Sequence, residues 1–224
     1  MPQIFPRGAN FVPLKIILVL AFLGMAAPAA IWYYWRPEYT KIGYQPAQPI
    51  PFSHKVHAGQ LGLDCRYCHS FVETAAHSNI PAAQVCMNCH SQVQKDNPKL
   101  APLREAWATG KPVEWVQIHK TPDHAYFNHS VHINRGVSCV SCHGRVDQMD
   151  VVAQDQSLSM DWCLTCHRAP ENALRPLDKV TDLGWHATPK GKESIEQAQE
   201  NLGKELQKQR GVNPPVSNCA GCHR

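Results

Sequence analysis

One short motif contains all ten cysteines of this 224-residue chain. C-x-x-C-H is the attachment signature of c-type haem. Its two thiols form thioethers with one porphyrin, and the histidine that follows binds the iron from the proximal side. The sequence therefore predicts five haem c groups. The attachment cysteines are Cys65, Cys68, Cys86, Cys89, Cys139, Cys142, Cys163, Cys166, Cys219 and Cys222, and the proximal ligands are His69, His90, His143, His167 and His223.

Other uses of cysteine pairs fit this pattern less well. Zinc ribbons need two pairs for each metal, and five pairs leave one over. Disulfide frameworks do not require a histidine after every pair. A thioredoxin-like pair would occur once, beside a βαβ pattern that is absent from this sequence. Histidine is 13 of 224 residues, so five chance repetitions have a probability on the order of 10⁻⁶ if each pair is an independent trial.

An internal duplication supplies candidates for the opposite, distal side of the irons. The block Phe52–His57 (FSHKVH) precedes the first motif, and Phe127–His132 (FNHSVH) precedes the third, 75 residues later. The unit is F-x-H-x-V-H followed by two C-x-x-C-H motifs, and the fifth motif lies outside it. Residues three apart share one helical face, so each pair of histidines can serve two neighbouring irons. The predicted distal ligands are His54, His57, His129 and His132.

The fifth distal ligand is less closely defined. His77, His119, His124 and His186 remain, together with methionines such as Met160. We favour His119, which precedes the third motif, and Met160, three residues before Cys163, is the runner-up. A methionine ligand would raise the reduction potential of its haem.

The N-terminal segment has the length of a membrane span. Ile16–Trp35 is uncharged over twenty residues, and a helix of that length is about 30 Å long. Arg7 and Lys15 precede it, which puts the N-terminus in the cytoplasm, and Trp32–Trp35 is an interfacial aromatic belt. The alternative is a cleaved signal peptide, because Ala27-Pro28-Ala29 is similar to a cleavage site. We favour a single-pass anchor in the bacterial inner membrane, with the haem domain on the periplasmic side.

The amino-acid composition indicates the expected architecture. Aromatic residues are only 8% of the chain, so the porphyrins are expected to supply much of the core. The formal charge of +4 is too small to indicate nucleic-acid binding. We expect a mainly α fold with irregular loops and little sheet. Its predicted parts are 1–36 (tail and transmembrane helix), 37–51 (Pro-rich stem), 52–126 and 127–187 (dihaem repeats), and 188–224 (helix and fifth haem site).

Two further helices are expected. Pro102–Thr109 has proline at its first position, as helices often do. In 193–210, Ile195, Ala198, Leu202 and Leu206 form one apolar stripe that Gly211 and two prolines terminate.

The blocks FSHKVH…CRYCH…CMNCH and YFNHSVH…CVSCHG…MDWCLTCHR, with the single N-terminal anchor, resemble the pentahaem subunit of bacterial alternative complex III. Its haem modules are similar to class III (c3/c7-type) multihaem cytochromes. The resemblance covers nearly the whole chain and is most specific over His119–Arg168. It implies that the first histidine of each pair, His54 or His129, serves the haem that follows it.

The resemblance also implies a place in a membrane complex that oxidises quinol. The implied partners are an iron–sulfur subunit, integral membrane quinol-binding subunits and a monohaem cytochrome, with electrons leaving to a periplasmic carrier or an oxidase. The chain would then be an electron-transfer subunit, not an enzyme by itself. The alternatives are a self-contained, membrane-anchored quinol dehydrogenase and a multihaem enzyme with an open haem site.

Overall fold

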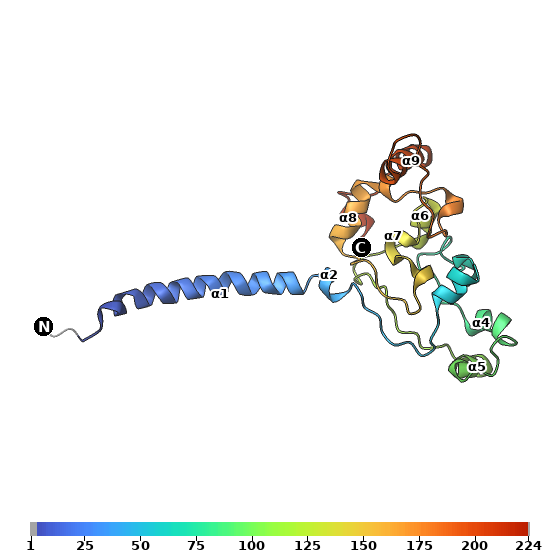
Figure 1. The fold of residues 1–224 in the computed structure, drawn as a ribbon, viewed down its shortest axis with the longest axis horizontal. Helices are drawn as coiled ribbons and strands as arrows, with labels where there is room; N and C mark the ends of the chain where they lie inside the picture. Colours follow the sequence, from blue (N-terminus) through green and yellow to red (C-terminus); the bar gives the residue numbers. More distant parts are fainter. Residues whose placement is uncertain (1–3, 224) are drawn as a thin grey trace. The chain divides into compact units, whose positions relative to one another are not determined.

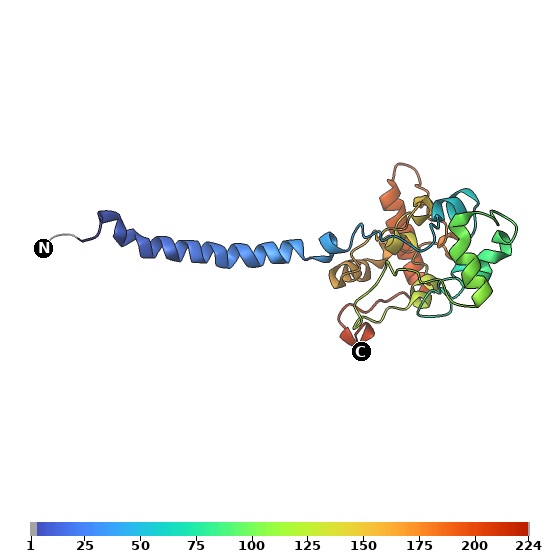
Figure 2. The ribbon, with the colours of Figure 1, turned by 90° about the horizontal axis from the view of Figure 1, so that it is seen from below.

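The apolar N-terminal segment forms helix α1, Val12–Tyr34, in the computed structural model, which describes residues 4–223. A short helix, η1 (Arg7–Phe11), leads into it, and the helix continues past Pro28 without a break (Figure 2). Gly8–Tyr34 is long and apolar enough to cross a membrane, and no side chain of α1 is buried within the protein. The predicted N-terminal apolar helix is therefore confirmed. The side chain of Arg7, on which the predicted orientation partly depends, lies outside the described residues, as do residues 1–3 and 224 of the predicted parts.

The chain forms two compact units that divide between Thr40 and Lys41. The boundary falls inside the predicted stem, 37–51. The first residues of the predicted stem form α2 (Pro37–Thr40). Its remaining residues, 41–51, belong to the second unit and are hydrogen-bonded to it. The Gly43 N–H donates to the Gln154 carbonyl at 2.8 Å, and the Gln154 N–H donates to the Tyr44 carbonyl at 3.0 Å. The Gln48 side chain donates to the Val116 carbonyl (2.9 Å) and accepts from the Val116 N–H (3.0 Å).

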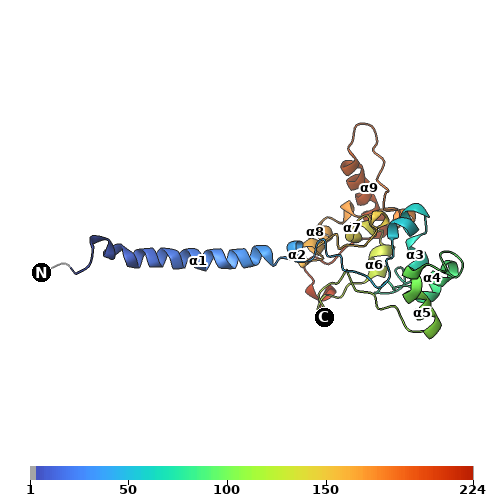
Figure 3. The ribbon, with the colours of Figure 1, turned by 60° about the horizontal axis from the view of Figure 1, so that its bottom comes forward.

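The second unit consists of short helices joined by irregular loops. In residues 4–223 there is no β-sheet, and the strand pairing consists of one isolated bridge, Val137 with Leu174. The expected mainly α architecture is confirmed. Figures 1 and 3 place α4 and α5 beside each other at one end of this unit and α9 at the other. The elements are η2 (Lys55–Gln60), α3 (Cys65–Cys68), α4 (Ala83–His90), η3 (Pro98–Leu100), α5 (Ala101–Thr109), α6 (His129–Asn134), α7 (Val140–His143), η4 (Val146–Gln148), α8 (Met160–Arg168), η5 (Pro170–Asn172), η6 (Leu177–Lys179), α9 (Ile195–Arg210) and η7 (Cys219–Gly221).

Helix α9 confirms the helix expected in 193–210 and adds one contact that the apolar stripe does not contain. Ser194 and Gln197 form a capping box, and Gly211 ends the helix with φ of 58°. The buried positions are Ala198, Gly203 and Leu206, whereas Ile195 of the predicted stripe is 49% exposed. A Cβ atom on Gly203 would overlap the Glu171 carbonyl in η5, so glycine is what allows the two backbones to touch. Helix α5 likewise agrees with the expected helix at Pro102–Thr109.

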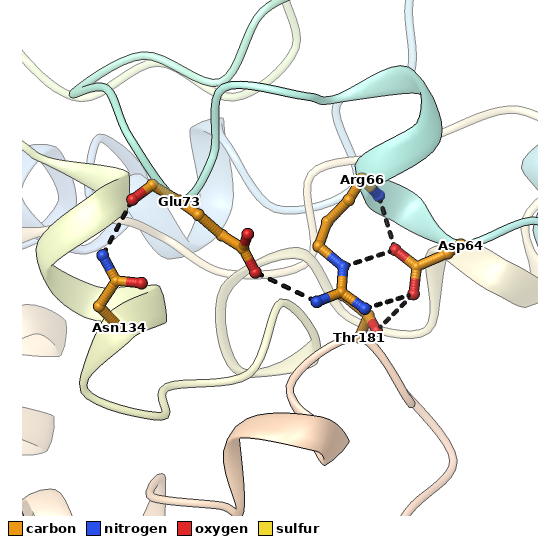
Figure 4. A network of polar contacts seen from close by, with 5 residues as sticks. All are labelled: Asp64, Arg66, Glu73, Asn134 and Thr181. Atoms are coloured by element: carbon orange, nitrogen blue, oxygen red, sulfur yellow. Dashed lines mark hydrogen bonds and ion pairs between the residues drawn. The ribbon is translucent and has the colours of Figure 1, made fainter.

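A polar network ties three distant segments together (Figure 4). The Asp64 carboxylate accepts hydrogen bonds from the backbone and guanidinium of Arg66 and from the Thr181 hydroxyl, at 2.8–3.0 Å. The second arm of Arg66 reaches Glu73 at 3.1 Å, and the Asn134 amide donates to the Glu73 carbonyl at 2.9 Å. The first haem motif is thereby joined to α6 and to the loop after η6.

The apolar core of the described residues is small. Ten apolar side chains are buried, and none of them is aromatic. They are Ile50, Val72, Leu103, Ala106, Leu174, Val180, Leu183, Ala187, Ala198 and Leu206. Polypeptide alone therefore supplies only a thin core for a unit that begins at Lys41.

Candidate haem sites

Each C-x-x-C-H motif lies on a turn of helix. The carriers are α3, α4, α7, α8 and η7. The backbone N–H of His69, His143 and His223 donates to the carbonyl of the first cysteine of its motif at 2.8–2.9 Å. This winding places the two cysteines, three residues apart, on one side of the turn, with the histidine next to them. No disulfide bond joins any of the ten cysteines.

Four of the five predicted proximal histidines are oriented by a backbone carbonyl. The ring Nδ1 atoms of His69, His90, His167 and His223 lie 2.7–3.0 Å from carbonyl oxygens. A hydrogen bond from Nδ1–H fixes the tautomer and leaves Nε2 to bind a metal. The acceptors belong to Asn79, Val93, Pro215 and His124, which no sequence motif marks.

The two repeats present their second histidine in the same way. His57 and His90 have ring centres 6.1 Å apart, and His132 and His167 have ring centres 6.2 Å apart. The Nδ1 atoms of His57 and His132 lie 2.8 and 2.7 Å from the carbonyl four residues before them. With metal–nitrogen bonds of about 2 Å, two imidazoles on one iron have centres about 6 Å apart. Each pair therefore fits the two sides of one iron.

The phenylalanine ring of each repeated block contacts both histidine rings of that block. The Phe52 ring lies 4.8 Å from that of His54 and 4.4 Å from that of His57. The Phe127 ring lies 4.7 and 4.5 Å from those of His129 and His132. The phenylalanine is repeated in both blocks, and this repetition is the sequence signal for its contact with the two histidines.

One extra residue distinguishes the two repeats. Eight positions separate His57 from Cys65, whereas seven separate His132 from Cys139. The first block continues into η2, which is π-helical, and the second into the α-helix α6. A π turn accommodates an added residue without changing the face that the flanking side chains share. The insertion thus leaves the His57 geometry equal to that of His132.

Five half-buried histidines form a cluster around His143. His143 has a ring-centre distance of 6.4 Å to His129 with near-parallel planes, and of 4.3 Å to His119 with planes at 79°. His69 and His54 are electrostatic neighbours of His143 as well. Burial lowers the pKa of His143 to about 3 and that of His54 to about 4. These rings are neutral at pH 7, the form that binds a metal.

The remaining candidates lie elsewhere. The Nδ1–H of His223 points at the His124 carbonyl, and the two rings are 5.5 Å apart, so the His124 backbone stands behind His223 on its proximal side. His77 and His186 are exposed. Met160 is the first residue of α8 and is 64% exposed. Cys163 of α8 and Cys222 are electrostatic neighbours, which places the fourth and fifth motifs close together.

The donor set fits covalent haem. The imidazoles of His57 with His90 and of His132 with His167 stand at iron-spanning distances, and the Nδ1 atom of each ring lies beside a backbone carbonyl. The two thiols of each motif lie on or next to the turn that carries its proximal histidine. Two ring nitrogens, His54 Nδ1 and His119 Nε2, are covered and have no hydrogen-bond partner among residues 4–223.

Comparison with known proteins agrees with this chemistry. Residues 50–106 match the family model of cytochrome c7 and related cytochrome c. The chain is 31% identical over 175 residues to the multiheme cytochrome c subunit of menaquinone reductase from Nitratidesulfovibrio vulgaris. The alignment covers 73% of this chain and 76% of that protein.

Proposed function

This chain belongs to the multihaem cytochrome c family, and on that premise we propose that it is an electron-transfer subunit that carries five haem c groups. The count comes from the five C-x-x-C-H motifs. The observation that supports haem ligation most directly is the equal geometry of the two repeats, 6.1 Å for His57 with His90 and 6.2 Å for His132 with His167. The remaining three motifs have the same winding or the same carbonyl-oriented histidine.

The chain's residues divide the work at each site. The ten cysteines fix the porphyrins, the histidine after each pair ligates from the proximal side, and His54, His57, His129 and His132 ligate from the distal side. Haem c supplies one-electron redox chemistry when it is bound, and imidazoles on both axial positions exclude substrate. The distance of 6.4 Å between His129 and His143 supports the assignment of the first histidine of each pair to the haem that follows.

The fifth distal ligand determines whether one haem stays open. The structure places His119 beside His143 and puts the His124 backbone behind His223. Of the two residues that the sequence favoured, Met160 is therefore the better candidate for the iron of His223, because it begins the helix that carries the neighbouring fourth motif. Near-infrared absorption of the oxidised protein tests this, since methionine ligation of ferric haem has its own charge-transfer band. A high-spin ferric EPR signal would instead support the enzyme with an open haem site.

We further propose that the subunit acts in a membrane complex of the alternative complex III type, which oxidises quinol. Its partners would be an iron–sulfur subunit, integral membrane quinol-binding subunits and a monohaem cytochrome, and its acceptor a periplasmic carrier or an oxidase. The relative named for a menaquinone reductase favours a second candidate, the reverse direction with electrons delivered to the quinone. Helix α1 would anchor the chain in the inner membrane, with Arg7 and Lys15 on the cytoplasmic side and the haem-bearing parts (52–126, 127–187 and 188–224) in the periplasm.

Purification of the complex through a tag on this chain, in mild detergent, tests the assignment. We expect an iron–sulfur subunit and integral membrane subunits to co-purify with the chain. In this complex, a menaquinol analogue should reduce the haems. Recovery of the chain alone, with haems that are rapidly reduced by the quinol analogue, would instead support the self-contained quinol dehydrogenase. Reduction of quinone by pre-reduced haems, without the opposite reaction, would favour the reductase.

A further inference from the structure

The two repeats contact each other through equivalent residues. The Lys55 backbone N–H donates to the Met149 carbonyl at 3.0 Å, and the Ser130 N–H donates to the Ala75 carbonyl at 3.2 Å. Lys55 and Ser130 occupy the same place in the two F-x-H-x-V-H blocks. Ala75 and Met149 each lie six residues after a motif histidine, in the first and the third motif respectively. The block of each repeat is therefore bound to the loop that follows the first motif of the other repeat.

A second pair of contacts repeats this pattern. The Asn134 side-chain amide donates to the Glu73 carbonyl at 2.9 Å (Figure 4). The residue equivalent to Asn134 is Gly59, and the residue equivalent to Glu73 is Asp147. Gly59 lies directly against the Asp147 carbonyl, where an added Cβ atom would overlap the oxygen. One repeat thus reaches the carbonyl with a side chain, and the other reaches the equivalent carbonyl with its backbone.

The two loops that receive the blocks, 71–76 and 145–150, contain the same turn. The Thr74 N–H donates to the Phe71 carbonyl at 3.1 Å, and the Gln148 N–H donates to the Arg145 carbonyl at 2.9 Å. These four residues are equivalent in pairs, 74 positions apart. Each loop therefore presents its carbonyl groups to the opposite block from the same local structure.

The first cysteines of the first and third motifs meet each other. The Cys65 and Cys139 side chains are hydrogen-bond partners, and His69 and His143 are electrostatic neighbours. In a two-fold arrangement of like units, each contact occurs twice with the roles exchanged, and equivalent residues meet only beside the axis. The contacts between the repeats have this pattern, with the approximate axis beside Cys65 and Cys139.

We propose that each dihaem repeat positions the distal histidines of the other repeat: block 52–57 is seated on loop 145–150, and block 127–132 on loop 71–76. The inference rests on the proposed function, because it takes the histidines of both blocks as axial ligands. Groups that hold a ligand from behind set the orientation of its ring at the metal. A single repeat would lack the surface that holds its own distal ligands.

Asn134→Ala and Gly59→Ala test the two halves of this arrangement separately, in the full chain. Hydrogen–deuterium exchange followed by mass spectrometry measures local opening of each segment. In Asn134→Ala, exchange in 127–134 and in loop 71–76 should become about 2- to 10-fold faster, the range that one net hydrogen bond contributes. In Gly59→Ala the added methyl group must displace the Asp147 carbonyl, so the faster segments should be 52–60 and loop 145–150. In each variant the segments of the other half should keep their wild-type exchange.

EPR of the oxidised proteins tests whether the contacts position ligands. Both variants should keep the haem content of the wild type and show no new high-spin signal. The g values of low-spin signals should shift, because they depend on the orientation of the axial imidazoles, and different signals should shift in the two variants. Asn201→Ala and Gly24→Ala are the matched controls: the Asn201 amide bonds Glu193 at the surface of α9, and an added Cβ on Gly24 of α1 meets no atom within 4 Å. Both controls should match the wild type.

Three results would overturn the proposal. Faster exchange confined to the repeat that carries the substitution, or equal in all four segments, would contradict the reciprocal seating, and unchanged g values would reduce the contacts to packing. Where Gly59→Ala loads too little haem to measure, Asn134→Ala decides by the same criteria. The pyridine haemochrome of the wild type keeps these outcomes apart from a failure of the proposed function. Fewer than five haems would contradict that function, whereas the exchange pattern tests the contacts at any haem count.

Discussion

At the scale of single residues, the second nitrogen of each histidine determines what the first can do. His57 and His132 both direct Nδ1 at the carbonyl four residues earlier, although one lies in a π-helix and the other in an α-helix. This contact leaves Nε2 of each ring to bind a metal, and the rings stand 6.1 and 6.2 Å from those of His90 and His167. If these histidines bind the irons as proposed, backbone carbonyls contribute to the choice of ligand as much as histidine content does.

Replacement of one distal histidine should open one haem. In His132→Ala the cysteines and His167 remain, so we expect full haem content and the conversion of one haem from low to high spin, visible by EPR of the oxidised protein. His77→Ala, at an exposed histidine, serves as the control. An entirely low-spin spectrum of His132→Ala would remove His132 from the ligand set.

Asp64 should make a small, pH-dependent contribution to the free energy of unfolding. Hydrogen bonds from Arg66 hold its pKa down to about 2, from an ordinary value of 3.8. A carboxyl with a lowered folded-state pKa stabilises the fold above the unfolded pKa and loses that effect as the pH falls toward about 2. Because the pair is partly exposed, Asp64→Asn should cost less than about 1 kcal/mol at pH 7.

Urea unfolding of Asp64→Asn and wild type at several pH values measures this effect. The difference between them should shrink as the pH falls below about 4. Asp96→Asn, at an exposed site, should show no such trend. A difference that stays constant with pH would contradict the assigned role.

The sequence predicted residues with a local signature and missed those without one. The cysteines, the following histidines and the paired histidines were predicted from spacing alone. The carbonyls of Pro215 and His124 were not, because they lie 48 and 99 residues from the histidines that they orient. A backbone carbonyl is supplied by every residue type, so no composition marks it.

At the scale of elements, Gly203 controls how closely α9 approaches η5. Gly203→Ala should destabilise the protein by about 1–3 kcal/mol, because the added methyl group overlaps the Glu171 carbonyl and the helix must shift. Thermal or urea unfolding measures the loss. Glu205→Ala, on the exposed side of the same helix, should remain near wild type. An unchanged stability of Gly203→Ala would mean that the contact is not tight in solution.

Helices with strong ends were predicted well, and their contacts were not. The apolar spacing, Gly211 and the prolines after it were enough to predict α9, and the structure adds the Ser194 cap. The pattern of apolar residues could not reveal Gly203, because a glycine contributes to packing by the side chain that it lacks. The π-helix η2 accompanies one inserted residue, which is visible only when the two repeats are aligned.

At the scale of the whole molecule, the number of attached haems tests all five predicted attachment motifs at once. Intact mass spectrometry of the purified protein should give the mass of the chain plus five haem groups. In the double variant Cys219→Ser and Cys222→Ser, one haem should be lost and four retained. A wild-type mass with fewer than five haems would mean that one motif is not used for attachment.

The overall architecture was predictable from the sequence, whereas the hydrogen bonds that tie the predicted stem to distant residues were not. The apolar N-terminal helix is predicted from hydropathy. The helical unit with little sheet is predicted from the composition and from the glycines and prolines along the sequence. Residues after Thr40 were expected to form a spacer because they are rich in proline. Instead, Gln48 and the Tyr44 backbone bind partners 68 and 110 residues away, respectively.

The thin apolar core also bears on how the protein is made. With only ten buried apolar side chains among residues 4–223, none of them aromatic, the chain has little reason to fold before its porphyrins are joined to it. On the proposed periplasmic location, it would therefore stay unfolded during export, and each Cys-x-x-Cys-His would remain open to the enzymes that attach haem. Maturation and folding would then be a single process, in which every attached cofactor adds its own share of the core.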